Sequence, residues 1–150
     1  VIVLSRQKVP YINPKNSREN KCINGAYEVN ITSHESNVTL IASGTEVELA
    51  LKVQDKLKEN NIHSKVISMP CMELFDKQPD EYKKDLIEEN SFVITIEAGS
   101  ITHWQKYIKN KGFNFGIDQF GESAPYKEVY NHFNLTEEKI TNYIQTKLRK

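Results

Sequence analysis

The sequence has few cysteines and no spacing typical of a metal site. Its 150 residues include two cysteines and four histidines. Cys22 and Cys71 lie far apart and form no C-x-x-C pair, and the scattered histidines add no metal-ligand pattern. We therefore expect no metal site, and two free thiols in a reducing compartment.

An excess of charge of one sign is also absent. Twenty Lys and Arg residues balance twenty Asp and Glu residues, and no Lys/Arg block is longer than two. This balance argues against a nucleic-acid partner and against an anionic membrane surface. No apolar run approaches the ~20 residues that a membrane helix needs. We therefore expect neither nucleic acid nor membrane among the partners.

The N-terminus lacks an initiator methionine and a signal-peptide layout. The chain opens with VIVLSRQKVP, which is typical of a strand already in progress. This opening predicts a fragment of a larger protein, with any targeting segment upstream.

The composition that is present favours one soluble globular domain, with 38% hydrophobic and 27% charged residues. Residues 8–21 are rich in Pro, Asn and Ser, which predicts a linker. Residues 25–32 (GAYEVNIT) alternate between apolar and polar, which predicts an edge strand.

Short apolar runs alternate with amphipathic stretches from residue 38 onward. Val38 to Ala42 is nearly all apolar, as in strands buried on both faces. An apolar stripe then predicts a helix, with the residues Val47, Ala50, Val53 and Leu57. Further elements are expected as strand 64–70, short helix 81–90, strand 91–97, helix 101–108, strand 113–118 and a helix capped by Thr136. This order predicts an α/β fold, an open three-layer α/β/α sandwich with a mainly parallel sheet.

The turn Ser43-Gly44-Thr45-Glu46 joins the first of these strands to its helix. Such a turn either binds a phosphate or only starts the helix. Thr45 and Glu48 have capping-box spacing, as do Ser43 and Glu46. A phosphate turn normally adds a Lys or further glycines, whereas this turn has one glycine and acidic neighbours. We expect a helix start; the alternative is a stand-alone anion- or nucleotide-binding module that uses the Ser43–Thr45 turn.

The sequence contains four other candidate site features. Glu97 follows a strand, where α/β proteins gather ligands, and a binding or a structural role remains open. His103 is expected at the surface beside a core Trp104. Cys71 has no neighbouring His or Lys to lower its pKa, so a reactive thiol is not expected. The FGESAP stretch (120–125) predicts a turn and lacks the spacing of a nucleophile elbow.

Arg6 directly follows an apolar strand, at the end where open α/β sheets place their ligands. A guanidinium there can bind a phosphate through two charge-assisted hydrogen bonds. Arg6 is therefore the candidate phosphate ligand.

Six motifs occur in a fixed order along the chain: LSRQ (4–7), LIASGTEVELA (40–50), VISMPCMELFDKQ (66–78), IEAG (96–99), GIDQFGESAP (116–125) and FNLT (133–136). Together they closely resemble the C-terminal portion of transketolases, over nearly the whole chain. Two departures from the family pattern are Ser43-Gly44-Thr45-Glu46, where T-G-S-E is usual, and Cys71, where Ser is common. Residues 8–36 match poorly.

The resemblance implies an enzyme of the pentose phosphate pathway. Transketolases transfer a two-carbon ketol unit from a ketose phosphate to an aldose, with thiamine diphosphate and Mg²⁺ or Ca²⁺, as cytoplasmic homodimers. In the family the cofactor lies between the first two domains, and the G-D-G stretch with a following Asn that binds it is absent from this sequence. The resemblance therefore implies no catalytic, cofactor or metal residue here. The Arg of the SRQ stretch helps to hold the sugar phosphate in the family, which implies that role for Arg6.

The resemblance also suggests how the chain divides. Residues 1–36 are expected to be the end of a preceding pyrimidine-type domain with a linker and edge strand, and residues 37–150 the transketolase C-terminal domain. The fragment alone is expected to be structural, dimer-supporting and inactive. Dihydroxyacetone synthase shares these motifs and is the nearest enzymatic alternative.

Overall fold

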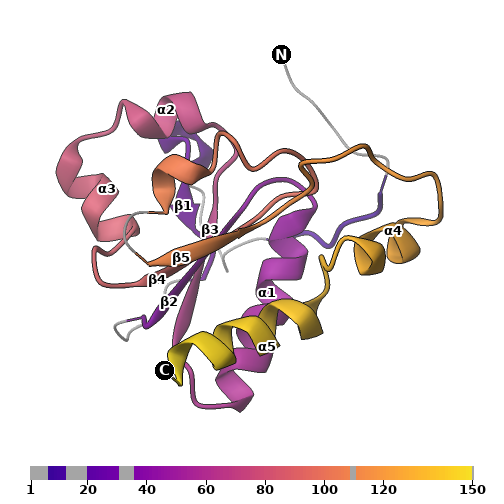
Figure 1. Cartoon of the computed structure of the whole chain (residues 1–150). Helices are drawn as coiled ribbons and strands as arrows, with labels where there is room; N and C mark the ends of the chain where they lie inside the picture. The colour runs from indigo at the N-terminus through magenta and orange to yellow at the C-terminus, as the bar shows by residue number, and fades with distance from the viewer. Residues whose placement is uncertain (1–6, 13–19, 31–35, 109–110, 150) are drawn as a thin grey trace.

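The computed structural model describes residues 7–12, 20–30, 36–108 and 111–149, which form one mixed five-stranded sheet with helices on both faces (Figure 1). The strands are β1 (Tyr27–Glu28), β2 (Val38–Ala42), β3 (Ser64–Ser68), β4 (Phe92–Ile96) and β5 (Gly112–Phe115). Their order in the sheet is β1-β3-β2-β4-β5. β2 pairs in parallel with β3 and β4, β4 pairs in parallel with β5, and only β1 is antiparallel. The predicted mainly parallel sheet is confirmed.

The helices are α1 (Glu46–Glu59), α2 (Met72–Asp76), α3 (Asp80–Leu86), α4 (Tyr126–His132) and α5 (Glu137–Leu148). Two short 3₁₀ helices accompany them, η1 (Lys21–Asn24) and η2 (Gln105–Tyr107). Among the described helices, none is long and apolar enough to cross a membrane.

Successive side chains of the buried strands point to opposite faces of the sheet and pack into two separate hydrophobic cores. Leu40 and Ala42 of β2 pack in the core on the α1 and α5 side, whereas Ile41 packs with residues of α2, α3 and η2 on the opposite face. This two-residue period is what a strand buried on both faces requires. The predicted three-layer sandwich is confirmed.

The helix α1 lies side by side with α5 over one face of the sheet (Figure 1). The predicted stripe of α1 is confirmed, because Val47, Ala50, Val53 and Leu57 are all buried. The predicted cap of α5 is also confirmed, since the Thr136 hydroxyl accepts a hydrogen bond from the amide of Lys139 at 3.4 Å.

The helix predicted over 101–108 is wrong. The segment forms turns and the single 3₁₀ turn η2, with hydrogen bonds from Trp104 N to Ile101 O at 2.9 Å and from Tyr107 N to Trp104 O at 3.1 Å. These bonds span three residues, which is the 3₁₀ pattern rather than the α pattern. Trp104 and Tyr107 are thereby both buried against the sheet.

Two helices, α2 and α4, were not predicted. They have five and seven residues, which is too short for an apolar stripe to repeat. The edge strand expected at 25–32 is confirmed at the sheet edge but is shorter, with β1 as its regular part and residues 31–32 outside the described residues.

Candidate functional site

The carboxyl ends of β2, β3 and β4 meet at one edge of the sheet. The chain leaves β2 toward α1 on one face and leaves β4 toward η2 on the other. Such a divergence is where open α/β sheets place ligands. A pocket of about 460 Å³ lies at this edge, and its lining includes Ser43, Glu97 and Trp104. We use "carboxyl-edge site" for the polar side chains gathered here, namely Ser43, Thr45, Glu46, Glu97, Trp104 and Tyr130.

The Ser43–Glu46 turn starts α1, as expected, but not through the predicted capping box. The Thr45 hydroxyl caps no amide of α1 and instead donates to Glu46 Oε1 at 2.6 Å. The Ser43 hydroxyl donates to Glu97 Oε2 at 3.2 Å. Backbone bonds satisfy two amides of the first turn, from Glu46 N to Ser43 O at 3.1 Å and from Glu48 N to Thr45 O at 3.3 Å. The capping box fails because both hydroxyls have carboxylate acceptors beside them.

Glu46 is the most buried carboxylate of the carboxyl-edge site, with 5% of its surface exposed. Its Oε1 accepts hydrogen bonds from Thr45 and from the Tyr130 hydroxyl of α4. A carboxylate in the first turn of a helix is also favoured by the helix dipole. Burial, and then the hydrogen bond to Glu46, raises the pKa of Tyr130 to about 12. Tyr130 therefore stays a neutral hydrogen-bond donor at physiological pH.

Glu97 lies at the end of β4 and is half-buried. Burial raises the pKa of the Glu97 carboxyl, and the nearby Glu46 carboxylate raises it further. Hydrogen bonds from Ser43 and from the indole N–H of Trp104 partly oppose this shift. Since partners from its own chain already occupy the carboxyl group, the geometry favours the structural role over the binding role.

The turn does not fit an anion. Glu46 and Glu97 place two acidic groups at the start of α1, where a phosphate or diphosphate would lie. The stand-alone anion-binding module is therefore not favoured. Within the described ranges, no group of three or more His, Cys, Asp or Glu residues could hold a metal ion.

The other candidates are placed as follows. His103 is exposed beside a Trp104 that is only 3% exposed, as predicted. Cys22 and Cys71 are both free thiols, as predicted. Arg6 lies outside the described residues, so its role stays a prediction. Gln7, the next residue, is described and exposed, and its side chain partly opposes the rise in the pKa of Tyr130.

Sequence reasoning missed Glu46 and Tyr130 as partners. They are 84 residues apart, and no local pattern links them. The sequence predicts Glu46 only as a capping-box partner of Ser43 and as negative charge near the turn, because nothing in the sequence indicates that its carboxylate is buried. Only the tertiary fold, which places Tyr130 of α4 beside the start of α1, brings the two side chains together.

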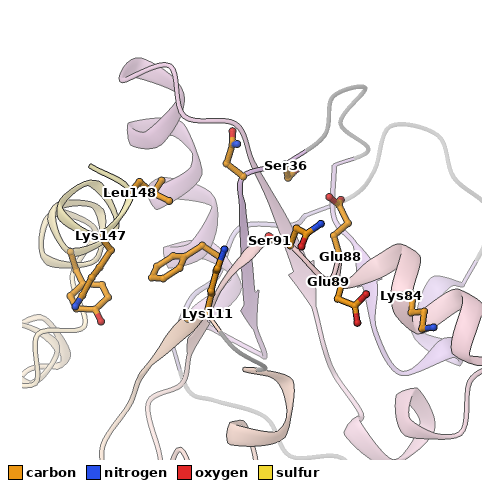
Figure 2. Close-up of a pocket in the computed structure, with 13 residues that line it drawn as sticks. Ser36, Lys84, Glu88, Glu89, Ser91, Lys111, Lys147 and Leu148 are labelled. Atoms are coloured by element: carbon orange, nitrogen blue, oxygen red, sulfur yellow. The ribbon is translucent and has the colours of Figure 1, made fainter. Parts of the chain in front are cut away.

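A second pocket, of about 970 Å³, lies at the opposite edge of the sheet, before β2, β4 and β5 begin (Figure 2). Figure 2 shows Lys147 and Leu148 of α5 on one side and Glu88 and Glu89 on the other. Lys and Glu side chains are mixed along its wall, and Glu88 is already paired with the buried Lys65 at 2.6 Å. The charges along this pocket are therefore mixed, and they do not favour a ligand of either charge.

We predict that Glu97→Gln stabilises the domain increasingly as the pH rises from 4 to 7. A carboxyl whose folded pKa is raised binds more protons in the folded than in the unfolded state, so its contribution to stability is lost as the pH rises through that window. Gln keeps an acceptor for Ser43 and Trp104 but carries no charge. Thermal melts of both proteins across this range measure the difference. Exposed Glu59→Gln is the control and should give a flat difference; a flat difference for Glu97→Gln would contradict the assignment.

Together, the mixed sheet, the two helical layers and the carboxyl-edge site define an α/β domain of the open, doubly wound class. The family model described as "Transketolase-like TK C-terminal domain" matches residues 25–136. The chain belongs to this transketolase C-terminal domain family.

The curated relatives are transketolases that are much longer than this chain. The chain is 34% identical to a transketolase of Aquifex aeolicus and 36% identical to one of Bacillus subtilis, over 95% and 99% of this chain but 21% and 23% of theirs. The chain thus spans about a fifth of the length of these curated relatives.

Solved transketolase structures have the same fold as this chain. A Pichia stipitis transketolase structure superposes with a TM-score of 0.82 at 28% identity, covering 94% of this chain and 20% of the other. A further structure of that transketolase, in complex with sedoheptulose-7-phosphate, has a TM-score of 0.73 at 28% identity and covers 80% of this chain and 17% of the other.

Proposed function

We propose that this chain works as the C-terminal domain of a full-length transketolase, which transfers a two-carbon ketol unit from ketose phosphates to aldose phosphates in the pentose phosphate pathway. The observation that supports this most strongly is the family match over 25–136, joined to relatives of which the chain spans about a fifth. We place the enzyme in the cytoplasm and expect it to act as a homodimer.

The full enzyme is proposed to use thiamine diphosphate and Mg²⁺ or Ca²⁺, but this domain does not fit the cofactor. A diphosphate needs bare amides or cations, whereas Glu46 and Glu97 flank the turn at the start of α1. The cofactor would supply the carbanion chemistry from elsewhere in the enzyme. The part proposed for this domain is to support the fold and the dimer.

We propose that the domain boundary lies before β1 rather than at residue 36. β1 pairs with β3 at Tyr27–Ser68 and Glu28–Ile67, so it belongs to the same sheet as the strands after residue 37. The family match, which begins at residue 25, supports the same boundary. The residues before it are proposed to be the linker and the end of a preceding pyrimidine-type domain.

The one substrate contact proposed for this chain is Arg6, as a ligand of the sugar phosphate. Two observations support it. A relative was solved in complex with sedoheptulose-7-phosphate. Gln7, the neighbour of Arg6, lies near enough to Tyr130 to influence its pKa, and Tyr130 is at the carboxyl edge of the sheet, the edge where α/β proteins bind ligands. Replacing Arg6 in the full-length enzyme and comparing phosphorylated with unphosphorylated donors tests this proposal.

We predict that residues 1–150 alone give no saturable heat when titrated with thiamine diphosphate and Mg²⁺ in a calorimeter. The reason is that the acidic groups at the start of α1 oppose a diphosphate. The full-length enzyme is the positive control. A dissociation constant in the micromolar range for the isolated residues would show that this domain has a cofactor site of its own.

A further inference from the structure

We propose that the pocket between α2, α3 and η2 binds a small aromatic carboxylate, whose ring lies on an apolar floor and whose charge lies among three lysines. The pocket has a volume of about 360 Å³ and is lined by side chains from residues 75–87 and 106–107. We call it the α3 pocket. It lies on the face of the sheet opposite α1 and α5 (Figure 1). This binding site goes beyond the proposed ketol transfer and does not depend on it.

The floor of the α3 pocket is apolar and aromatic. Phe75, Ile87 and Tyr107 line it, and all three belong to the buried core on this face of the sheet. The Phe75 and Tyr107 rings pack at a tilt, with their centroids 5.8 Å apart. A concave site of roughly 300–1,000 Å³ with apolar walls and a few polar groups is the usual form of a small-molecule site. Because aromatic side chains favour offset or edge contacts with a further ring, this floor favours a flat apolar ligand.

Two carboxylates at the rim already have partners from this chain. Asp76 Oδ1 accepts a hydrogen bond from the Tyr107 hydroxyl at 3.0 Å, and Asp76 Oδ2 accepts one from Lys106 Nζ. Burial alone would raise the pKa of the Asp76 carboxyl, but these hydrogen bonds lower it, so the group stays ionised. Asp80 Oδ1 lies 2.9 Å from Lys83 Nζ in an ion pair. A cationic ligand would have to displace one of these lysines, so the rim does not favour it.

The lysines of the α3 pocket outnumber its carboxylates, which leaves one positive charge uncompensated. Three lysines line the pocket, namely Lys83, Lys84 and Lys106. Within the described part of the chain, the exposed Lys84 makes no hydrogen bond or ion pair. Each ammonium group has three N–H donors, so these lysines can donate to a further acceptor. One carboxylate on the ligand would supply both the missing negative charge and the acceptor oxygens.

Calorimetric titration of the full-length enzyme with three probes tests the class of ligand. Phenylacetate has the ring and the carboxylate, phenylethanol has the ring without the charge, and acetate has the charge without the ring. Phenylacetate should saturate with a Kd of about 1 mM or tighter, which is an ordinary affinity for a ligand of its size. Phenylethanol and acetate should each bind at least about 3-fold more weakly, because each lacks one of the two interactions.

Three variants of the full-length enzyme test whether the α3 pocket is the site. Lys84→Gln removes the uncompensated charge and should weaken phenylacetate binding by about 3- to 10-fold. Asp80→Asn removes a negative charge from an exposed position and releases Lys83, so it should tighten binding. Lys58→Gln is the matched control, since Lys58 is an exposed lysine of α1 on the opposite face of the sheet, and it should leave the Kd unchanged.

The inference is supported if phenylacetate binds more tightly than the other two probes and if Lys84→Gln and Asp80→Asn shift its Kd in opposite directions. It is overturned if phenylacetate does not saturate or if phenylethanol or acetate binds equally well. A Kd that the two pocket variants do not shift in opposite directions, or that Lys58→Gln shifts as much as Lys84→Gln, also overturns it, because the binding then lies elsewhere in the enzyme. Since the readout is binding, its failure leaves the proposed ketol transfer untouched.

Discussion

Gly25→Ala should destabilise the domain by about 2–5 kcal/mol. Gly25 has φ +79°, and a Cβ there would lie 2.3 Å from Phe75 N and 2.4 Å from Cys71 O. The left-handed conformation costs an L-residue roughly 1–2 kcal/mol, and the clash adds roughly 1–3 kcal/mol. Both contacting atoms are backbone atoms, one in α2 and one in the residue that precedes it, so no side chain can move aside. Urea denaturation measures the loss in free energy of unfolding.

Gly44→Ala is the matched control for this prediction. Gly44 also has a left-handed φ, +53°, but among the described residues nothing lies within 4 Å of its would-be Cβ. It should therefore lose only the conformational cost, about 1–2 kcal/mol. Equal losses at the two glycines would contradict the close approach of η1 and α2 that the structure shows.

The strands were predictable because burial on both faces leaves an unmistakable pattern. Val38–Ala42 and Phe92–Ile96 are short, apolar and rich in branched side chains, and both are central strands. The long helices were equally predictable, since α1 and α5 each repeat an apolar stripe over three turns or more. The alternation of these strands and helices was enough to predict the three-layer α/β/α arrangement.

The segment 101–108 shows where periodicity misleads. Apolar residues three or four apart fit an α-helix, but a 3₁₀ turn buries residues at a spacing of three equally well. Trp104 and Tyr107 are buried at that spacing. A single turn gives too few repeats to distinguish the two patterns.

The carboxyl-edge site was only partly predictable. The sequence placed Ser43, Thr45 and Glu97 at the right edge, because they directly follow predicted parallel strands. Their hydrogen-bond partners could not be predicted, since the capping pattern assumed that each hydroxyl has only helix amides to bond. Tertiary packing brings Glu97 to Ser43, whereas Glu46 directly follows Thr45 in the sequence. Tyr130, which bonds to Glu46, lies on α4, a helix that the sequence pattern did not predict.

Replacing Arg6 with Ala in the full-length enzyme should lower kcat/KM for a ketose phosphate by roughly 10- to 150-fold. Hydrogen bonds to a charged group contribute about 1.5–3 kcal/mol, and about 1.4 kcal/mol corresponds to a factor of ten. The phosphate is remote from the bond that breaks and is held alike in the ground and transition states. The loss should therefore appear mostly in KM.

The substitution Arg6→Lys tests whether the positive charge of the side chain or the planar shape of the guanidinium accounts for phosphate binding. An ammonium group keeps the positive charge but not the planar fork that matches two phosphate oxygens. We expect it to recover only part of the loss. Full recovery would mean that charge alone holds the phosphate, and no recovery would mean that the two aligned bonds contribute nearly all of the affinity.

The ratio of kcat/KM for a ketose phosphate to kcat/KM for hydroxypyruvate, measured in the wild-type and Arg6→Ala full-length enzymes, tests the central claim most directly. Hydroxypyruvate lacks the phosphate, so its kinetics should barely change, and the ratio should fall by roughly 10- to 150-fold. An unchanged ratio, with both donors losing activity together, would contradict the claim that this chain supplies a ligand for the sugar phosphate.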